Sequence, residues 1–278
     1  MTPDISYQSL AICLLLLLIP IILSSRIKLR IAATTVISAI RMIVQLFLVG
    51  IFLKYIFDLN NPILNVGWFV LMITFATLSV IRSTGLEVKS FLLPSFGAFA
   101  SANFFVLIYF NYFVVSLSNI FEAKYLIAIG GMLLGNSLRG NIVGIGDFYN
   151  DLRKNEKTYT YYLSLGASRL EAAVPFLRKS LNAALKPTIS SMATMGIVSL
   201  PGMMTGQILG GSSPLVAIKY QIAIMISIYA STTLSIFLAI IFTLRTSFDE
   251  FGILNKDIYK PFSYSNLIHL KIFRYGRK

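Results

Sequence analysis

The feature that most constrains this chain is a series of long apolar runs. Each run has roughly the 20 mostly apolar residues needed to cross a bilayer core about 30 Å thick. The sequence is 56% hydrophobic and only 13% charged, with a mean hydropathy of +0.77, which is more apolar surface than a soluble domain could bury. We therefore expect an all-α integral membrane protein with about seven transmembrane helices, at residues 5–23, 31–56, 63–81, 91–117, 125–144, 188–210 and 216–243.

The basic residues are divided unequally between the two sides that these spans create. Most of the 24 Lys and Arg residues fall on one side, whereas Lys54 and Lys124 fall on the other. Because cytosolic loops carry an excess of basic residues, the pattern predicts an amino terminus outside and a carboxyl terminus in the cytosol. It also predicts a permease domain at residues 1–244 and a basic cytosolic tail at residues 245–278.

The net charge of +13 bears on partners. In a soluble protein such a charge would point to nucleic acid. Here the basic residues lie in loops between apolar runs, where they set topology and attract anionic lipid headgroups. We therefore expect membrane lipids and no nucleic acid as partners, and a multi-pass protein of the inner or plasma membrane.

The longest predicted cytosolic loop, at residues 145–187, has the pattern of two short helices around a glycine turn. Ser168 and Glu171 have the S-x-x-E spacing of a capping box, in which each side chain binds the backbone amide of the other residue. The helix that follows has apolar residues at helical spacing. We expect it to end at Pro187, because proline cannot continue the helical hydrogen bonds. Such a helix either lies on the membrane surface or docks a partner protein.

The sixth apolar run is expected to be helical up to Leu200 and is interrupted there by a proline. The glycines that follow repeat at four-residue spacing, which lets another helix approach closely. The alternative is a broken helix that lines a pathway, with its freed backbone groups facing a cavity. For either role the candidate residues are Asn136, Pro201, Gly202, Met203, Met204, Thr205, Gly206, Gln207 and Gly210.

Arg41 and Gln45 are spaced four residues apart in the second run. Charges at membrane depth are costly and tend to face a bundle interior or a water-filled cavity. Arg139 and Lys219 lie near span ends and can extend to the interface, whereas Arg41 lies more than one turn inside. We therefore assign Arg41 and Gln45 to the pathway or to helix packing. No Asp or Glu lies at the centre of a run, which disfavours a proton or sodium relay built on carboxylates.

The sequence lacks the motifs of the common membrane and ATP-using enzymes. It has no G-x-x-x-x-G-K-[ST] phosphate loop and no G-x-S-x-G nucleophile motif. The single histidine, His269, excludes a two-histidine zinc motif, and the single cysteine, Cys13, excludes a disulfide within the chain. We expect a transport subunit rather than an enzyme, with no cofactor of its own and with any metal ligands left open.

Residues 199–209, with the sequence SLPGMMTGQIL, resemble the signature of the FetB-type permeases, also called YbbM. Members of that family are the membrane subunits of an ABC iron exporter, and the plant aluminium-tolerance permeases are similar. The resemblance runs from about residue 41 to residue 242, with further matches at residues 41–46, 130–137 and 163–168.

This resemblance implies a permease that docks on a separate ABC ATPase through a cytosolic coupling helix. ATP and Mg would be held by that ATPase, and a chain with one membrane half would work as a homodimer. The residues that match the coupling turn are Leu165, Gly166, Ala167, Ser168 and Glu171.

The residues indicate the class of transporter more clearly than they indicate the substrate. The resemblance implies export of iron or another metal, but the spans offer no carboxylate or imidazole for a hard cation. Met203 and Met204 would suit copper(I) or simple packing, and Arg41 would suit an anionic or chelated solute. The alternatives are therefore a self-contained channel or secondary transporter for an anionic or chelated solute, and a membrane-embedded scaffold or enzyme. The capped loop favours the ABC permease, because a channel does not require it.

Overall fold

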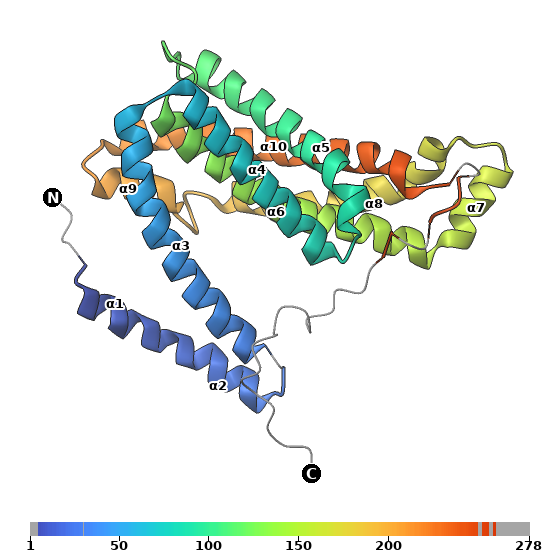
Figure 1. Cartoon of the computed structure of the whole chain (residues 1–278), viewed down its shortest axis with the longest axis horizontal. Helices are drawn as coiled ribbons and strands as arrows, with labels where there is room; N and C mark the ends of the chain where they lie inside the picture. The colour runs from blue at the N-terminus through green and yellow to red at the C-terminus, as the bar shows by residue number, and fades with distance from the viewer. Residues whose placement is uncertain (1–4, 30, 250–251, 256–257, 260–278) are drawn as a thin grey trace.

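The computed structural model describes residues 5–29, 31–249, 252–255 and 258–259. Within these residues the chain is built of helices (Figure 1). They are α1 Tyr7–Leu14, η1 Leu15–Leu17, α2 Leu18–Arg26, α3 Ala32–Leu59, α4 Pro62–Thr84, α5 Val88–Tyr109, the π-helix η2 Phe110–Val114, α6 Ala123–Lys154, α7 Glu156–Ser164, α8 Arg169–Thr194, α9 Gly202–Leu209 and α10 Pro214–Ser247.

Six helices of the described chain are long and apolar enough to cross a membrane, which confirms the all-helical membrane architecture. They are Tyr7–Arg26, Ala32–Leu59, Pro62–Thr84, Val88–Val114, Ala123–Lys154 and Pro214–Ser247. Each overlaps one of the predicted spans. The prediction succeeds here because a helix solvated by lipid must be apolar over its whole length, so run length alone marks it.

The predicted span at residues 188–210 is broken, as expected, but the prediction that it stays helical up to Leu200 is wrong. Helix α8 ends at Thr194, six residues before the predicted break at Leu200, and α9 begins only at Gly202. The prediction that Pro187 ends the preceding helix is also wrong, since Pro187 lies inside α8. A proline removes one hydrogen bond, which a long packed helix tolerates. The chain actually turns at Gly196, which has the positive φ of +86°.

The fifth helix is longer than its apolar run. Helix α6 continues ten residues beyond the predicted end at residue 144 and stops at Lys154. Its added turns bury Ile145, Phe148 and Leu152, while their opposite face is polar and exposed. An apolar run therefore does not mark these turns, although one face of them stays apolar.

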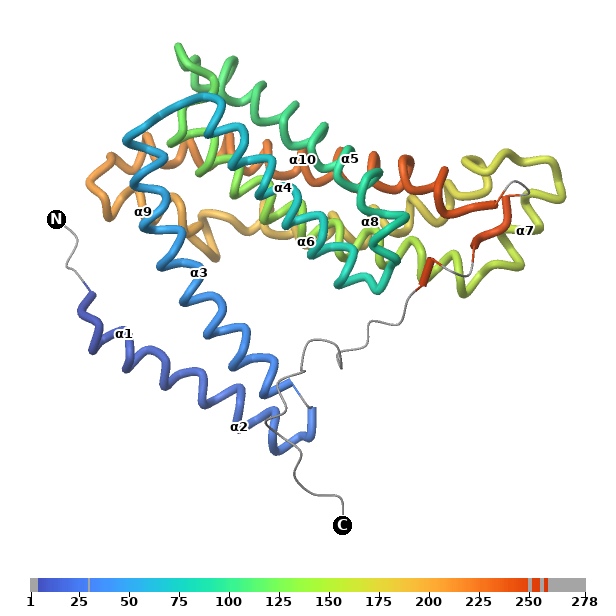
Figure 2. The backbone as a smooth tube through the Cα atoms, viewed as in Figure 1, coloured from blue at the N-terminus to red at the C-terminus, as the bar shows by residue number. Residues whose placement is uncertain are grey.

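The helices form a bundle and a separate arm (Figures 1 and 2). Helices α4, α5, α6, α8 and α10 run side by side in the bundle, with α10 packed along α5 and α6. The arm consists of α1, α2 and α3 and diverges from the bundle. Among its described residues only Ser24 and Ile56 are buried. The rings of Phe52 and Trp68, 4.5 Å apart, join the end of α3 to α4.

A buried polar ladder joins the three central helices of the bundle. Asn103 on α5 accepts a hydrogen bond from Ser231 Oγ on α10 at 2.9 Å, and the hydroxyls of Ser137 and Ser231 lie 3.1 Å apart. One turn further, Asn141 Nδ2 on α6 donates to Ser235 Oγ on α10 at 2.7 Å. All five side chains are fully buried. Because lipid offers no competing partners, such bonds between helices stabilise their association.

Helices α6 and α10 approach closely beside this ladder because α6 has glycines there. A Cβ atom on Gly144 would lie 2.6 Å from Ile236 Cγ2, and one on Gly140 would overlap the Thr232 methyl group. By contrast, a Cβ atom on Gly135 of the same helix would meet no atom within 4 Å. The spacing of α6 and α10 is therefore set by Gly140 and Gly144.

We predict that Gly144→Ala lowers the free energy of unfolding by about 1–3 kcal/mol, because the new methyl group must displace Ile236. Thermal unfolding in one detergent would measure the effect. The matched control is Gly135→Ala, which adds the same methyl group to an open face of α6 and should leave the melting temperature unchanged or raise it. Equal melting temperatures for the two variants would contradict the assigned packing.

Candidate functional site

The turn between α7 and α8 has a defined backbone shape. Gly166 N donates to Leu163 O at 2.9 Å, and Ala167 N donates to Tyr162 O at 3.1 Å. Gly166 has a φ of +90°, a conformation that residues with a Cβ atom rarely adopt. Open space surrounds its Cα atom, so backbone conformation rather than packing requires glycine there.

The capping box predicted at the start of α8 is present. Ser168 N donates to Glu171 Oε2 at 2.8 Å, and Glu171 N donates to Ser168 Oγ at 3.3 Å. The hydroxyl of Ser168 also donates to the Glu171 carboxylate at 2.7 Å. Hydrogen bonds from the Ser168 side chain and then from its backbone amide hold the pKa of Glu171 below its ordinary value. The carboxylate is therefore ionised at neutral pH, and the first turn of α8 is firmly closed.

Large apolar side chains around this turn are exposed. Leu165 is 67% exposed and Tyr161 is 60% exposed, and Leu170 at the start of α8 is also exposed. We call these three residues the coupling tip. The opposite face of α8 is buried through Ala172, Ala173, Phe176 and Leu177. The buried face anchors α8 to the bundle, and the coupling tip is left exposed on the other side.

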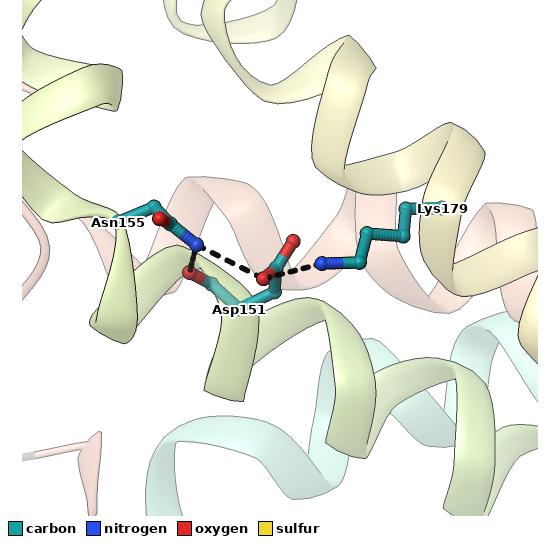
Figure 3. Close-up of polar contacts among 3 residues, drawn as sticks. All are labelled: Asp151, Asn155 and Lys179. Carbon is teal, nitrogen blue, oxygen red and sulfur yellow. Dashed lines mark hydrogen bonds and ion pairs between the residues drawn. The ribbon is translucent and has the colours of Figure 1, made fainter.

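An ion pair ties α8 to α6 behind the turn (Figure 3). Lys179 Nζ lies 2.8 Å from Asp151 Oδ1, and Asn155 Nδ2 donates to the same oxygen at 3.0 Å. The Lys179 side chain is mostly exposed, so the pair contributes only modestly to stability. It does orient the two helices at the end of the bundle that carries α7.

The segment between α8 and α9 is irregular and exposed. Gly196 N donates to Ser199 O at 2.9 Å, which closes a small loop. The two residues at its tip are exposed, with Ile197 at 92%. Figure 1 places α9 at the end of the bundle opposite α7, so the loop lies far from the coupling tip.

The predicted pathway residues of α9 divide into buried and exposed groups. Met204 is buried and Met203 packs against the core of the bundle. The Thr205 hydroxyl donates to Pro201 O at 3.0 Å. Gly202 and Gly206 are exposed, and a Cβ atom on either would meet nothing within 4 Å. The close helix approach that their spacing predicts is therefore not made by any of the residues that the structure describes.

The remaining predicted pathway residues lie elsewhere. Asn136 on α6 donates from Nδ2 to Met132 O at 2.8 Å, within its own helix. Arg41 and Gln45 are exposed on α3, and no described residue forms a hydrogen bond or ion pair with either side chain. They lie on the arm, separate from the α9 residues on the bundle.

The structure adds one residue to the α9 region that the sequence did not single out. Gln221 on α10 is buried, and its Nε2 donates to Met195 Sδ at 3.8 Å. Its carbonyl oxygen and that of Gln207 have no hydrogen-bond partner among the described residues. A glutamine inside the apolar run at residues 216–243 was the available signal. The described residues contain no group of three or more His, Cys, Asp or Glu that could hold a metal ion.

Comparison with known proteins places the chain in a family. Residues 7–248 match the family described as "Uncharacterised protein family (UPF0014)". The "Probable iron export permease protein FetB" of Escherichia coli is 32% identical over 251 residues, which cover 89% of this chain and 94% of that protein.

Two further relatives span bacteria and plants. The "UPF0014 membrane protein YjkA" of Bacillus subtilis is 30% identical, over 82% of this chain and 90% of that protein. The Arabidopsis thaliana "Protein ALUMINUM SENSITIVE 3" is 30% identical, over 81% of each chain. No solved structure matches the chain. With its apolar helices and these relatives, this chain is a multi-pass membrane protein that belongs to the UPF0014 family.

Proposed function

We propose that this chain is the membrane subunit of an ABC transporter that exports iron or another metal, and that a separate ATPase subunit hydrolyses the ATP. The observation that carries the proposal is the coupling tip, an exposed apolar surface on a capped turn at one end of the bundle. An apolar side chain that becomes buried at the centre of the interface is typical of surfaces that bind a partner protein. The name of the Escherichia coli relative supports the iron export part.

Helix α8 supports transmission from this surface into the bundle. It begins at the coupling turn and continues for 26 residues along α6 and α10. Helix α8 continues through Pro175 and Pro187 and packs along α6 and α10. A displacement of its first turn would therefore move its far end, which leads into the Met195–Ser199 loop and α9. The pathway residues of α9 are thus connected to the docking surface by one element.

The same helix supports seven membrane crossings, with the amino terminus outside and the carboxyl terminus in the cytosol. Helices α6 and α10 end and begin at opposite ends of the bundle, so α8 carries the chain back along it (Figure 1). In this arrangement the coupling tip lies on the side that carries most basic loops, which is the cytosolic side by the positive-inside rule.

Two surfaces support a homodimer. Arg41 and Gln45 are polar side chains on the exposed α3, and residues 195–201 are non-helical backbone at the exposed end of α8. A charge is costly in lipid and irregular backbone is not exposed to it, so both surfaces require protein or water. A second copy of this chain would cover them and would supply the close partner that Gly202 and Gly206 lack.

The proposed substrate rests more on the names of the relatives than on the residues of this chain. Met203 and Met204 offer thioethers that suit soft metals, and the unpartnered oxygens of Gln207 and Gln221 lie on the same pair of helices, α9 and α10. Arg41 favours the alternative, a self-contained transporter of an anionic or chelated solute, because its charge would attract an anion.

ATP hydrolysis by a candidate ABC ATPase from the same organism tests the proposal. The activity would be measured for the ATPase alone and with this chain in lipid nanodiscs, with and without ferrous iron. We expect stimulation that depends on this chain and responds to iron. An active ATPase that neither binds nor responds to this chain would instead support the self-contained transporter.

We predict that Gly166→Trp reduces the stimulation of ATP hydrolysis at least about tenfold, while the protein remains folded. The φ of +90° would be strained by a side chain, and the indole ring would project from the docking turn. Gly211→Trp is the matched control, because Gly211 also has a positive φ of +97° and open space but lies after α9. Normal stimulation of ATP hydrolysis by the Gly166→Trp variant would contradict a coupling role for this turn.

We also predict that Arg41→Ala reduces transport about tenfold, the effect of losing about 1.4 kcal/mol of stabilisation. Lys219→Ala should have a smaller effect, because Lys219 is exposed near the start of α10 and can extend to the interface. Uptake into or efflux from proteoliposomes of equal protein content would measure both. The reverse order would exclude Arg41 from the pathway.

A further inference from the structure

The chain reverses direction directly after α10. Asn255 N donates to Ser247 O at 2.9 Å, and Phe248 pairs with Leu254 in an antiparallel bridge. At the turn, Gly252 N donates to Asp249 O at 3.1 Å. We call the described residues 248–249, 252–255 and 258–259 the C-terminal strap. Its apolar side chains Phe248, Leu254 and Ile258 are buried, so the strap belongs to the packed bundle.

One end of the strap touches both sides of the coupling turn. A Cβ atom on Gly252 would lie 3.4 Å from Leu163 Cδ1, at the end of α7, and 3.4 Å from Arg169 Cγ, at the start of α8. The Phe248 ring lies 5.3 Å from the ring of Tyr159, which is the buried residue of α7. The strap therefore supports α7 from behind, on the side opposite the exposed coupling tip.

The other end of the strap is bonded to the turn between α4 and α5. Tyr259 pairs with Leu86 in an antiparallel bridge, and Glu87 N donates to Ile258 O at 2.8 Å. These are backbone contacts, so they hold the two segments in a fixed register. A displacement of the strap would therefore be passed to the first turn of α5.

The Tyr259 side chain adds a link to α6. Its hydroxyl donates to Tyr149 O at 2.7 Å, and the Arg153 guanidinium lies 4.9 Å above its ring. Burial raises the pKa of Tyr259 to about 12, so the hydroxyl remains a donor at neutral pH. A cation above an aromatic ring is attracted to the electrons of the ring, so Arg153 helps to hold Tyr259 against α6.

We propose that the C-terminal strap is a positioning element that holds the coupling turn in register with α6 and with the α4–α5 turn, so that a force applied at the coupling tip reaches the bundle. The proposal rests on the proposed function. Its physical basis is the size of α7, which has nine residues and is too short to be stable alone. With the strap packed behind it, α7 can transmit a displacement instead of unfolding locally.

The simpler explanation is that the strap only seals the end of the bundle. In that case its loss would lower stability and docking together. A positioning role predicts a different outcome, in which the ATPase still docks but no longer responds. The test must therefore separate docking, stability and stimulation.

The experiment uses the full chain in nanodiscs with the ABC ATPase. Gly252→Trp pushes the strap away from Leu163 and Arg169, and Tyr259→Ala removes the side-chain link between its other end and α6. For both variants we expect an ATPase dissociation constant within about twofold of the wild type and stimulation reduced about fivefold or more. Tyr259→Phe keeps the ring and should retain most of the stimulation. Ile253→Ala, at an exposed strap residue, is the matched control.

Three results would overturn the proposal. Unchanged stimulation by Gly252→Trp and Tyr259→Ala would show that the strap transmits nothing. Parallel losses of melting temperature, docking and stimulation would assign it a sealing role only. A wild-type chain that fails to dock the active ATPase would refute the proposed function itself, and with it the role of the strap.

Discussion

The close contact of α6 with α10 is the constraint on which the rest of this structure depends. Lipid solvates apolar side chains as well as another helix does, so packing and interhelical hydrogen bonds must hold the bundle together. Gly140 and Gly144 bring the two helices together, and the buried polar ladder bonds them to α5. Helix α4 and helix α8 then pack on α6, and the C-terminal strap follows from the end of α10.

The two ends of this bundle carry the features on which the proposed function rests. One end carries the coupling tip, which the strap and the Asp151–Lys179 pair support from behind. The opposite end carries α9, with buried thioether and amide groups. Helix α8 joins the two ends, so a single element connects docking to the candidate pathway. Most of the arm and residues 196–200 remain exposed, which is the arrangement expected if the chain functions with a second copy as proposed.

The sequence predicted the features that depend on local interactions. Spans were found because lipid exposure requires continuous apolar runs, and the capping box was found because Ser168 and Glu171 interact across one turn. The end of α8 was predicted at the wrong residue. Pro187 does not end α8, since a proline inside a packed helix costs one hydrogen bond without ending it, and the chain turns instead at Gly196. The polar ladder was also missed, because it depends on which faces of α5, α6 and α10 meet. No spacing within one helix contains that information.

The most direct test of the account is to locate the ATPase on the chain. In a Cys13→Ser background, single cysteines at Leu165 and at Leu209 would mark the coupling tip and the opposite end, both at exposed positions. A short thiol cross-linker would be applied to membranes that contain the ATPase subunit. We expect a cross-linked product from Leu165→Cys and none from Leu209→Cys. A product from Leu209→Cys, or from neither position in a membrane with stimulated ATPase activity, would contradict it.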